Sequence, residues 1–188
     1  MKRLALVALV AILGLAAQLR AGDSYKADPV HSSVIFAVRH AGAGNVWGRF
    51  NDPAGSFVLD EADPTKSTFT VEIPVANIDT HNEQRDTHLK SPAFFDAEKY
   101  PTITFKSTSV AKGKDNVLDV TGTLDMHGET KTITIPVELL GKGEFPPGTQ
   151  RFGVEAQFKV KKSDYKIIGV PGVGDEIRVI VAIEGTKQ

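Results

Sequence analysis

The sequence predicts an all-β domain, built either as a β-sandwich or as a closed antiparallel barrel. Two observations carry this prediction. Apolar and polar residues alternate in about eight short runs, which is the period of strands with one buried face. Short segments rich in Gly, Pro, Asn and Asp separate most of the runs, as expected for tight turns between neighbouring antiparallel strands. One segment, residues 77–107, departs from the pattern and carries many charges.

Residues 1–21 have the features of a cleaved secretory signal peptide. Lys2 and Arg3 form a basic start, and residues 4–17 are apolar and uncharged. This apolar run is shorter than the roughly 20 residues that a membrane-spanning helix needs. We therefore expect cleavage after residue 21, one domain over residues 22–188, a periplasmic location and no stable membrane span. The alternative is an uncleaved anchor.

Four strands are expected in the first half of the mature chain. Val34, Phe36 and Val38 share one face of the first strand, and a turn at residues 41–45 leads into the second. Pro74 cannot donate a hydrogen bond to a neighbouring strand, so it predicts an edge position or a bulge in the fourth. These expected strands are residues 31–40, 46–50, 55–60 and 68–75.

The charged segment that follows predicts a short helical insert between strands. Residues 82–89 can form two helical turns, with Asp79, Thr80 or Asn82 as the N-terminal cap. Ser91-Pro92 would end the helix, because the residue before a proline disfavours helical backbone. Three aromatic residues follow, and we expect them to pack the insert against the mouth of the domain. They are Phe94, Phe95 and Tyr100.

The second half returns to alternation. The expected strands are residues 102–110, 116–126, 131–140, 152–160 and 177–183. Strands of about ten residues span roughly 33 Å. Eight such strands, when closed, hold either packed side chains or one small ligand. The alternation alone leaves open whether the interior is full or hollow.

Composition excludes several functional classes. Without residues 1–21 the chain keeps 19 of its 22 Lys and Arg and all 23 Asp and Glu, a formal charge of 19 − 23 = −4. This balance argues against a nucleic-acid partner, which normally requires a basic patch. The chain has no Cys, which excludes disulfides, thiol catalysis and cysteine-bound zinc or iron–sulfur clusters.

No catalytic residue, metal site or cofactor is predicted. His81 and His88 are too far apart along the chain to share one ion on a helix, and no nucleophile motif or phosphate-binding loop occurs. Four basic side chains instead favour an anionic or strongly accepting group. They are Arg39, His40, Arg85 and His88. The alternative is that Arg85 and Asp86 only fix the helical insert to the rim.

Several stretches together resemble one known family. They are DPVHSSVIFAVRHAG, GRFNDPAGSF, NEQRDTHLKSPAFFDAEKYPTITF, GTLDMHGETK and GDEIRVIVAIEG. These stretches, spread over residues 24–185, resemble the YceI-like family of exported bacterial proteins. The resemblance implies an elongated, lipocalin-like, eight-stranded antiparallel barrel with a short helical insert and an apolar tunnel. It also implies a long-chain isoprenoid or other amphiphilic lipid as ligand, and a homodimer.

From the resemblance we expect an exported carrier or sequestering protein rather than an enzyme. The expected tunnel wall is Phe36, Val38, Phe69, Val71, Phe105, Phe158 and Val179. The lipid head group is expected at the mouth, near Arg39, His40, Arg85 and His88. One alternative is an enzyme of lipid or quinone metabolism that uses the same tunnel with acid–base residues of the insert. A third interpretation is a barrel with a filled core and no ligand.

Overall fold

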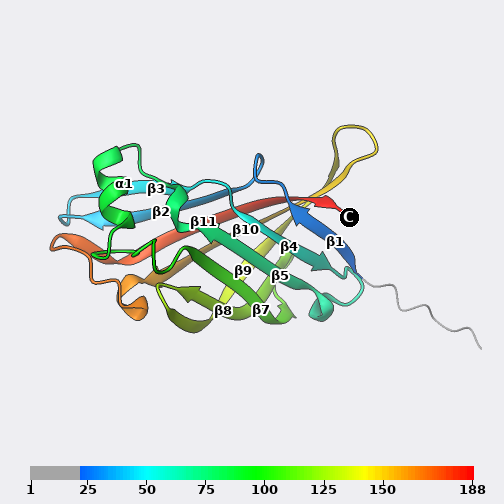
Figure 1. Ribbon diagram of the computed structural model, residues 1–188. Helices are drawn as coiled ribbons and strands as arrows, with labels where there is room; N and C mark the ends of the chain where they lie inside the picture. The colour runs from blue at the N-terminus through cyan, green and yellow to red at the C-terminus, as the bar shows by residue number, and fades with distance from the viewer. Residues whose placement is uncertain (1–21) are drawn as a thin grey trace, which may run out of the picture.

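A computed structural model describes residues 22–188, so the expected signal peptide lies outside the described residues (Figure 1). Within this range the chain forms eleven strands and one α-helix. The strands are β1 Asp23–Ala27, β2 Ser33–His40, β3 Gly44–Phe50, β4 Ala54–Leu59, β5 Thr68–Pro74, β6 Ile78–Asp79, β7 Thr102–Lys112, β8 Val117–Met126, β9 Glu129–Glu144, β10 Gln150–Lys161 and β11 Val173–Lys187. The helix is α1 Glu83–Lys90, and three 3₁₀ turns are η1 Pro64–Lys66, η2 Val75–Asn77 and η3 Lys162–Tyr165.

These strands close into an antiparallel barrel, as expected. Neighbours follow the order β1-β4-β5-β7-β8-β9-β10-β11, and β11 pairs back onto β1. At the other end of the barrel β2 takes the place of β1 beside β11, and β3 follows β2. Strands β1 and β2 therefore act as one long bent strand, as do β3 and β4, and β5 and β6. The result is a closed eight-stranded barrel.

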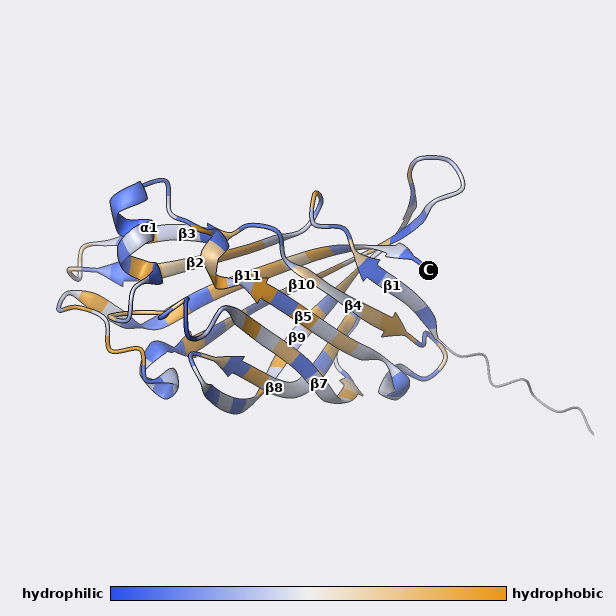
Figure 2. Cartoon of the chain, viewed as in Figure 1, coloured by the Kyte–Doolittle hydropathy of each residue, from blue (hydrophilic) through white to orange (hydrophobic). Residues whose placement is uncertain are grey.

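The two ends of the barrel differ. The described chain begins and ends on the side where the β9–β10 hairpin projects, at the right of Figure 1. Helix α1 and the β2–β3 and β10–β11 connections lie at the opposite end, at the left. We call these the terminal end and the α1 end. Figure 2 shows the expected alternation as bands of hydrophobic and hydrophilic residues along the strands.

Some details of the strands differ from the expectation. Strand β1 was missed because its five residues are too few for alternation to register. Pro74 was expected at an edge or a bulge. It pairs with Thr102 of β7, but the pairing of β5 with β4 stops at Glu72, so the proline has a strand neighbour on one side only. His127 and Gly128 connect β8 to β9, and both residues have the positive φ of a tight hairpin turn.

The insert forms the expected helix, which begins and ends one residue later than residues 82–89. The Asn82 side chain accepts a hydrogen bond from the Arg85 backbone N–H at 2.9 Å and caps α1, which ends before Ser91. Strand β6 has only two residues and pairs with β3. Helix α1 packs beside β6, so the insert continues the wall where strand pairing stops at the α1 end.

Candidate ligand-binding cavity

The interior of the barrel contains an apolar cavity toward the α1 end. It is lined by inward-facing residues of β2, β3, β5 and β7–β11 and by three residues of the insert. Among the described residues that line it, only Glu155 and Lys162 have charged side chains. The cavity volume is about 180 Å³, counted as room for the centres of water-sized spheres. A single buried water needs roughly 10–15 Å³ on this scale, so the cavity is much larger than a packing defect.

All seven residues expected in the tunnel wall line this cavity. Phe69 and Phe105 are buried, whereas the other five are only half-buried although they point into the barrel. Their exposure comes from the open space beside them. The structure therefore brings the seven side chains together, and contact with a ligand stays a prediction. The other five are Phe36, Val38, Val71, Phe158 and Val179.

Two glycines give the wall its aromatic lining. Gly48 lies opposite Phe36 on the neighbouring strand, and a Cβ at Gly48 would lie 2.4 Å from the Phe36 ring. Gly122 plays the same part for Phe105, whose ring would lie 2.6 Å from a Cβ there. Real side chains do not approach this closely. Each ring therefore occupies the place that a side chain at the glycine would take.

The insert contributes an apolar side to the cavity. Leu89, Phe94 and Phe95 line it, and the ring of Phe95 packs edge-on against Phe50 with 5.7 Å between ring centres. Phe94 also contacts the β10–β11 connection, since a Cβ at Gly169 would lie 2.9 Å from its ring. The expectation that aromatic residues pack the insert down is correct for these two phenylalanines.

Tyr100, the third expected aromatic, packs elsewhere. Its ring lies 4.8 Å from the ring of His127 in the β8–β9 turn, and it does not line the cavity. His127 Nδ1 is 2.9 Å from the backbone carbonyl oxygen of Tyr165, and the Tyr165 residue is buried. Burial raises the pKa of Tyr165 to about 12. These contacts join the end of the insert to η3.

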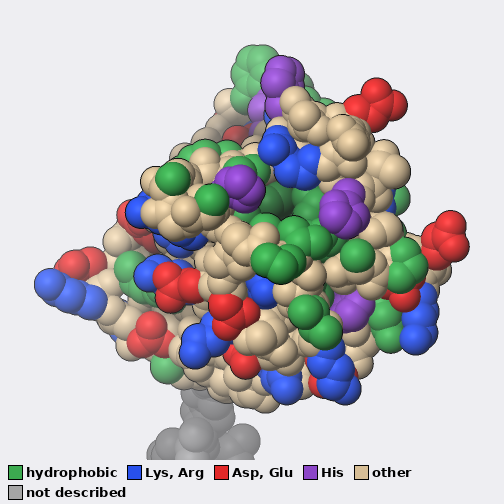
Figure 3. Space-filling model, turned by 90° about the vertical axis from the view of Figure 1, so that its left-hand side faces the viewer, with side chains coloured by type: hydrophobic (Ala, Val, Ile, Leu, Met, Phe, Trp, Pro, Cys, Tyr) green, Lys and Arg blue, Asp and Glu red, His purple; other side chains and the backbone are tan. Residues whose placement is uncertain are grey.

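The cavity opens at the α1 end. Figure 3 shows a hollow there, rimmed by hydrophobic side chains with His and basic side chains nearby. Ile167 and Val173, in or next to the β10–β11 connection, line the cavity, while Ile168 is 84% exposed. Lys162 Nζ donates a hydrogen bond to the Ile168 carbonyl oxygen at 2.7 Å. Alternation did not predict this part of the wall, because the β10–β11 connection is a Gly/Pro-rich loop without a strand period. The two isoleucines in the loop, Ile167 and Ile168, were the only sequence feature that could have indicated it.

None of the four expected mouth residues lines the cavity. Arg39 and His40 are exposed at the last positions of β2. His88 is exposed on α1, and its ring meets Phe94 edge-on with 5.0 Å between ring centres. They stand at the α1 end without reaching the interior. Their contact with a head group stays a prediction.

Arg85 makes contacts within the insert. Its Nε donates to Thr80 Oγ1 at 2.7 Å and its Nη2 donates to the Thr80 carbonyl oxygen at 2.6 Å. Asp86 Oδ1 accepts from Thr80 N–H at 2.9 Å and from Thr80 Oγ1 at 2.5 Å. Thr80 is 5% exposed. Arg85 and Asp86 therefore hold the turn between β6 and α1 through Thr80, a partner that the sequence did not indicate. Contact of Arg85 with a head group stays a prediction.

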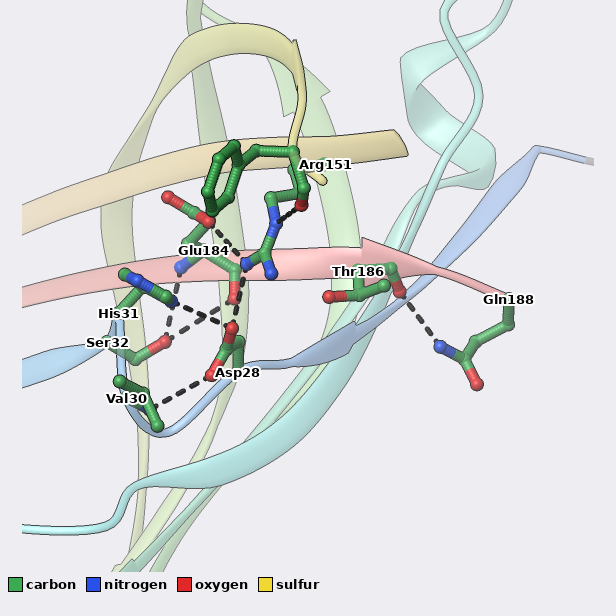
Figure 4. Close-up of polar contacts among 9 residues, drawn as sticks. Asp28, Val30, His31, Ser32, Arg151, Glu184, Thr186 and Gln188 are labelled. Carbon is green, nitrogen blue, oxygen red and sulfur yellow. Dashed lines mark hydrogen bonds and ion pairs between the residues drawn. The ribbon is translucent and has the colours of Figure 1, made fainter. Parts of the chain in front are cut away.

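A separate charged cluster lies on the outside of the barrel (Figure 4). Arg151 Nη1 donates to Asp28 Oδ2 at 2.7 Å and to Glu184 Oε1 at 2.6 Å, and His31 Nδ1 is 2.8 Å from Asp28. The Arg151 guanidinium holds the pKa of Asp28 well below its usual range. Asp28, His31 and Glu184 are close enough to share a metal ion. A guanidinium already bridges the two carboxylates, so we interpret the cluster as an ion-pair network. We call it the charged clamp.

The fold and cavity define a class: single-chain antiparallel barrels with a hollow apolar interior. The chain matches the YceI-like domain over residues 25–185, and it belongs to this family. It is 39% identical over 159 residues to protein YceI of Escherichia coli O17:K52:H18, covering 84% of this chain and 83% of the relative.

Two solved structures share the fold. BcnA of Burkholderia cenocepacia has a TM-score of 0.75 at 24% identity and covers 84% of this chain and 98% of its own. A polyisoprenoid-binding domain from Saccharophagus degradans, implicated in plant cell wall breakdown, has a TM-score of 0.69 at 17% identity, with coverages of 87% and 98%. At these identities the likeness concerns the fold. Across residues 22–188, the helices are too short or too polar to cross a membrane.

Proposed function

We propose that this protein is an exported carrier or sequestering protein that binds a long-chain isoprenoid or a similar amphiphilic lipid in the barrel cavity. The observation that carries the proposal is the apolar lining, which extends from the rim at the α1 end into the barrel. Membership of the YceI-like family supports it. So does the fold shared with a protein described as a polyisoprenoid-binding domain.

Hydrophobic burial supplies the affinity in this proposal. Each methylene group moved from water into an apolar site contributes about 0.8 kcal/mol. A long chain therefore binds tightly without a deep hydrogen-bonding partner. The polar end of the lipid stays near water at the α1 end, where Lys162 reaches the rim and Arg39, His40 and His88 stand nearby.

A matched pair of variants tests the proposal. Val179 points into the cavity, and Ile180, the next residue of β11, points outward. Native mass spectrometry of wild type with added geranylgeraniol should show a one-to-one complex. Val179→Asp should abolish it, since a carboxylate in an apolar site is costly, and Ile180→Asp should retain it. A folded wild type that binds neither this alcohol nor any lipid on purification would overturn the proposal.

We also infer that the protein is exported to the periplasm after removal of residues 1–21. The basic start and the short apolar run support this inference. N-terminal sequencing of the protein from a periplasmic fraction should begin at Gly22. A protein that retains Met1 and sediments with membranes would instead indicate an anchor.

Binding without turnover is favoured over the enzymatic alternative. Asp86 is engaged by Thr80, and His88 packs against Phe94. Neither side chain lines the cavity. A bound prenyl alcohol should be recovered chemically unchanged after long incubation. The homodimer that the resemblance implies stays a prediction, and light scattering of the purified protein tests it.

A further inference from the structure

We propose that three buried aromatic residues form a floor that ends the cavity and sets the maximum length of the bound chain. The floor consists of Tyr25, Phe57 and Phe152. This inference rests on the proposed function and adds a specificity to it: selection of the lipid by chain length.

The three rings pack against one another inside the barrel; Tyr25 and Phe57 are partners on the neighbouring strands β1 and β4, and Phe152 comes from β10. The ring centres of Tyr25 and Phe57 are 5.0 Å apart, those of Tyr25 and Phe152 are 5.6 Å apart, and those of Phe57 and Phe152 are 6.4 Å apart. Exposures are 2%, 3% and 5% for Tyr25, Phe57 and Phe152. Such contacts leave no passage between the rings for a hydrocarbon chain.

The floor lies directly beyond the last residues that line the cavity. Phe69 lines the cavity. Phe57 is the partner of Phe69 on the neighbouring strand, and the two rings stack with 6.0 Å between their centres. Val154 lines the cavity, but Phe152, two residues earlier on the same face of β10, does not. The cavity therefore ends between Val154 and Phe152 on β10, and between Phe69 on β5 and Phe57 on β4.

A glycine makes room for the floor. Gly185 follows Ile183, the last cavity-lining residue of β11, on the same face. A Cβ at Gly185 would lie 2.7 Å from the Phe57 ring and 2.8 Å from Cβ of Tyr25. Beyond the floor the interior is packed with residues that do not line the cavity. They are Leu59, Val110, Leu118 and Val120.

The charged clamp holds the strands that carry the floor. Arg151 precedes Phe152, and Glu184 precedes Gly185. The ion pair between Arg151 and Glu184 joins β10 to β11 (Figure 4), one residue away from the floor on each strand. Asp28 follows β1, accepts from Arg151, and donates its backbone N–H to the Glu184 carbonyl oxygen at 2.8 Å. A floor fixed from outside resists displacement by a longer ligand.

Chain-length selection follows from this arrangement. A chain that enters at the α1 end gains buried surface with each isoprene unit until it meets the floor. Further units must stay in water or displace the rings. Affinity should therefore rise with length and then stop rising. Up to this length limit, each added isoprene unit that fits in the cavity should lower Kd by at least about tenfold.

The experiment measures Kd for a series of linear prenyl alcohols, from farnesol through geranylgeraniol to solanesol, by native mass spectrometry. Phe57→Val should move the length limit upward, so that the first alcohol beyond the wild-type limit gains at least about tenfold. Val154→Phe should raise the floor and lower the limit. Leu59→Val is the control, because Leu59 lies one step farther from the cavity on the same face of β4.

The outcomes separate the two proposals. Opposite shifts in Phe57→Val and Val154→Phe, with an unchanged limit in Leu59→Val, would support the floor. If wild type binds prenyl alcohols but neither variant moves the limit while both melt cooperatively, the floor is wrong and the binding function stands. If wild type binds none of the alcohols, the proposed function fails.

Discussion

The two halves of the barrel interior are built by the same alternation and yet differ. In the half toward the terminal end, inward residues such as Val120 and Tyr25 are 0% and 2% exposed. In the half toward the α1 end, inward residues such as Val179 and Phe158 are half-buried beside the cavity. The comparison teaches that the strand period decides which face is inside, while side-chain volume and the strand ends decide whether the inside is filled.

The largest expected effect separates the halves directly. Phe152 and Phe158 lie on the same face of β10, the first in the filled half and the second at the cavity. Phe152→Ala should lower the free energy of unfolding by about 3–5 kcal/mol because its packing is complete. Phe158→Ala should cost less than half as much, because its ring already borders empty space. Urea unfolding of both variants checks this; equal losses would contradict the division into halves.

The next largest effect concerns the stability of the helical insert, which lies at the α1 end of the cavity. Asp86→Ala removes the acceptor of two hydrogen bonds from Thr80, which is buried. The variant should lose about 2 kcal/mol and exchange the backbone amides of residues 80–101 faster than the strands of the filled half. Hydrogen exchange measures both. Glu83→Ala, on the exposed first turn of the same helix, serves as the control and should change exchange far less.

A smaller effect, dependent on pH, tests the clamp beside the floor. Asp28 has a pKa below its usual value of 3.8 in the folded state, chiefly because Arg151 donates to it. Its contribution is present above about pH 4 and is lost as the pH falls through the folded-state pKa. Asp28→Asn should cost about 1 kcal/mol at neutral pH and flatten the acid loss of stability. The pKa of Asp63 is also lowered, chiefly by the Thr65 hydroxyl, but its ion pair with Lys66 is more exposed, so Asp63→Asn should show both effects to a smaller extent.

The smallest effect lies on the outer face of the hollow half. The Arg178 guanidinium carbon is 5.0 Å from the ring centre of Trp47, which is 49% exposed. Trp47→Ala should cost about 0.5–1 kcal/mol and leave the Kd for a prenyl alcohol unchanged, since the contact lies outside the barrel. A large loss of affinity would mean that the ligand uses the outer wall.

Sequence reasoning located the inner face well because a strand has a strict period of two. Val179 and Phe158 were placed on the inner face for that reason, and the helical insert followed from its cap and its terminal proline. The same reasoning could not choose between a sandwich and a barrel. The closing pairs, such as Tyr25 with Lys187, join residues that are far apart in the chain, and no local pattern reports them.

The mouth residues show a different limit. Charge and type made Arg85 a candidate for a head group, but its guanidinium is held by Thr80. That contact depends on how the chain turns between β6 and α1, where no period applies. Alternation also could not predict whether the interior is hollow. That depends on packing between strands: Gly185, for example, leaves room for the ring of Phe57 on another strand.

The pairing of β1 with β11 has a consequence for the order of assembly. The barrel is closed by pairing between the first and the last described strands, β1 and β11. A chain that is still emerging from the ribosome or from a translocation channel lacks β11, so its sheet has two open edges and no enclosed interior. A ligand such as the proposed lipid can therefore enter an enclosed cavity only after the C-terminal strand has been added.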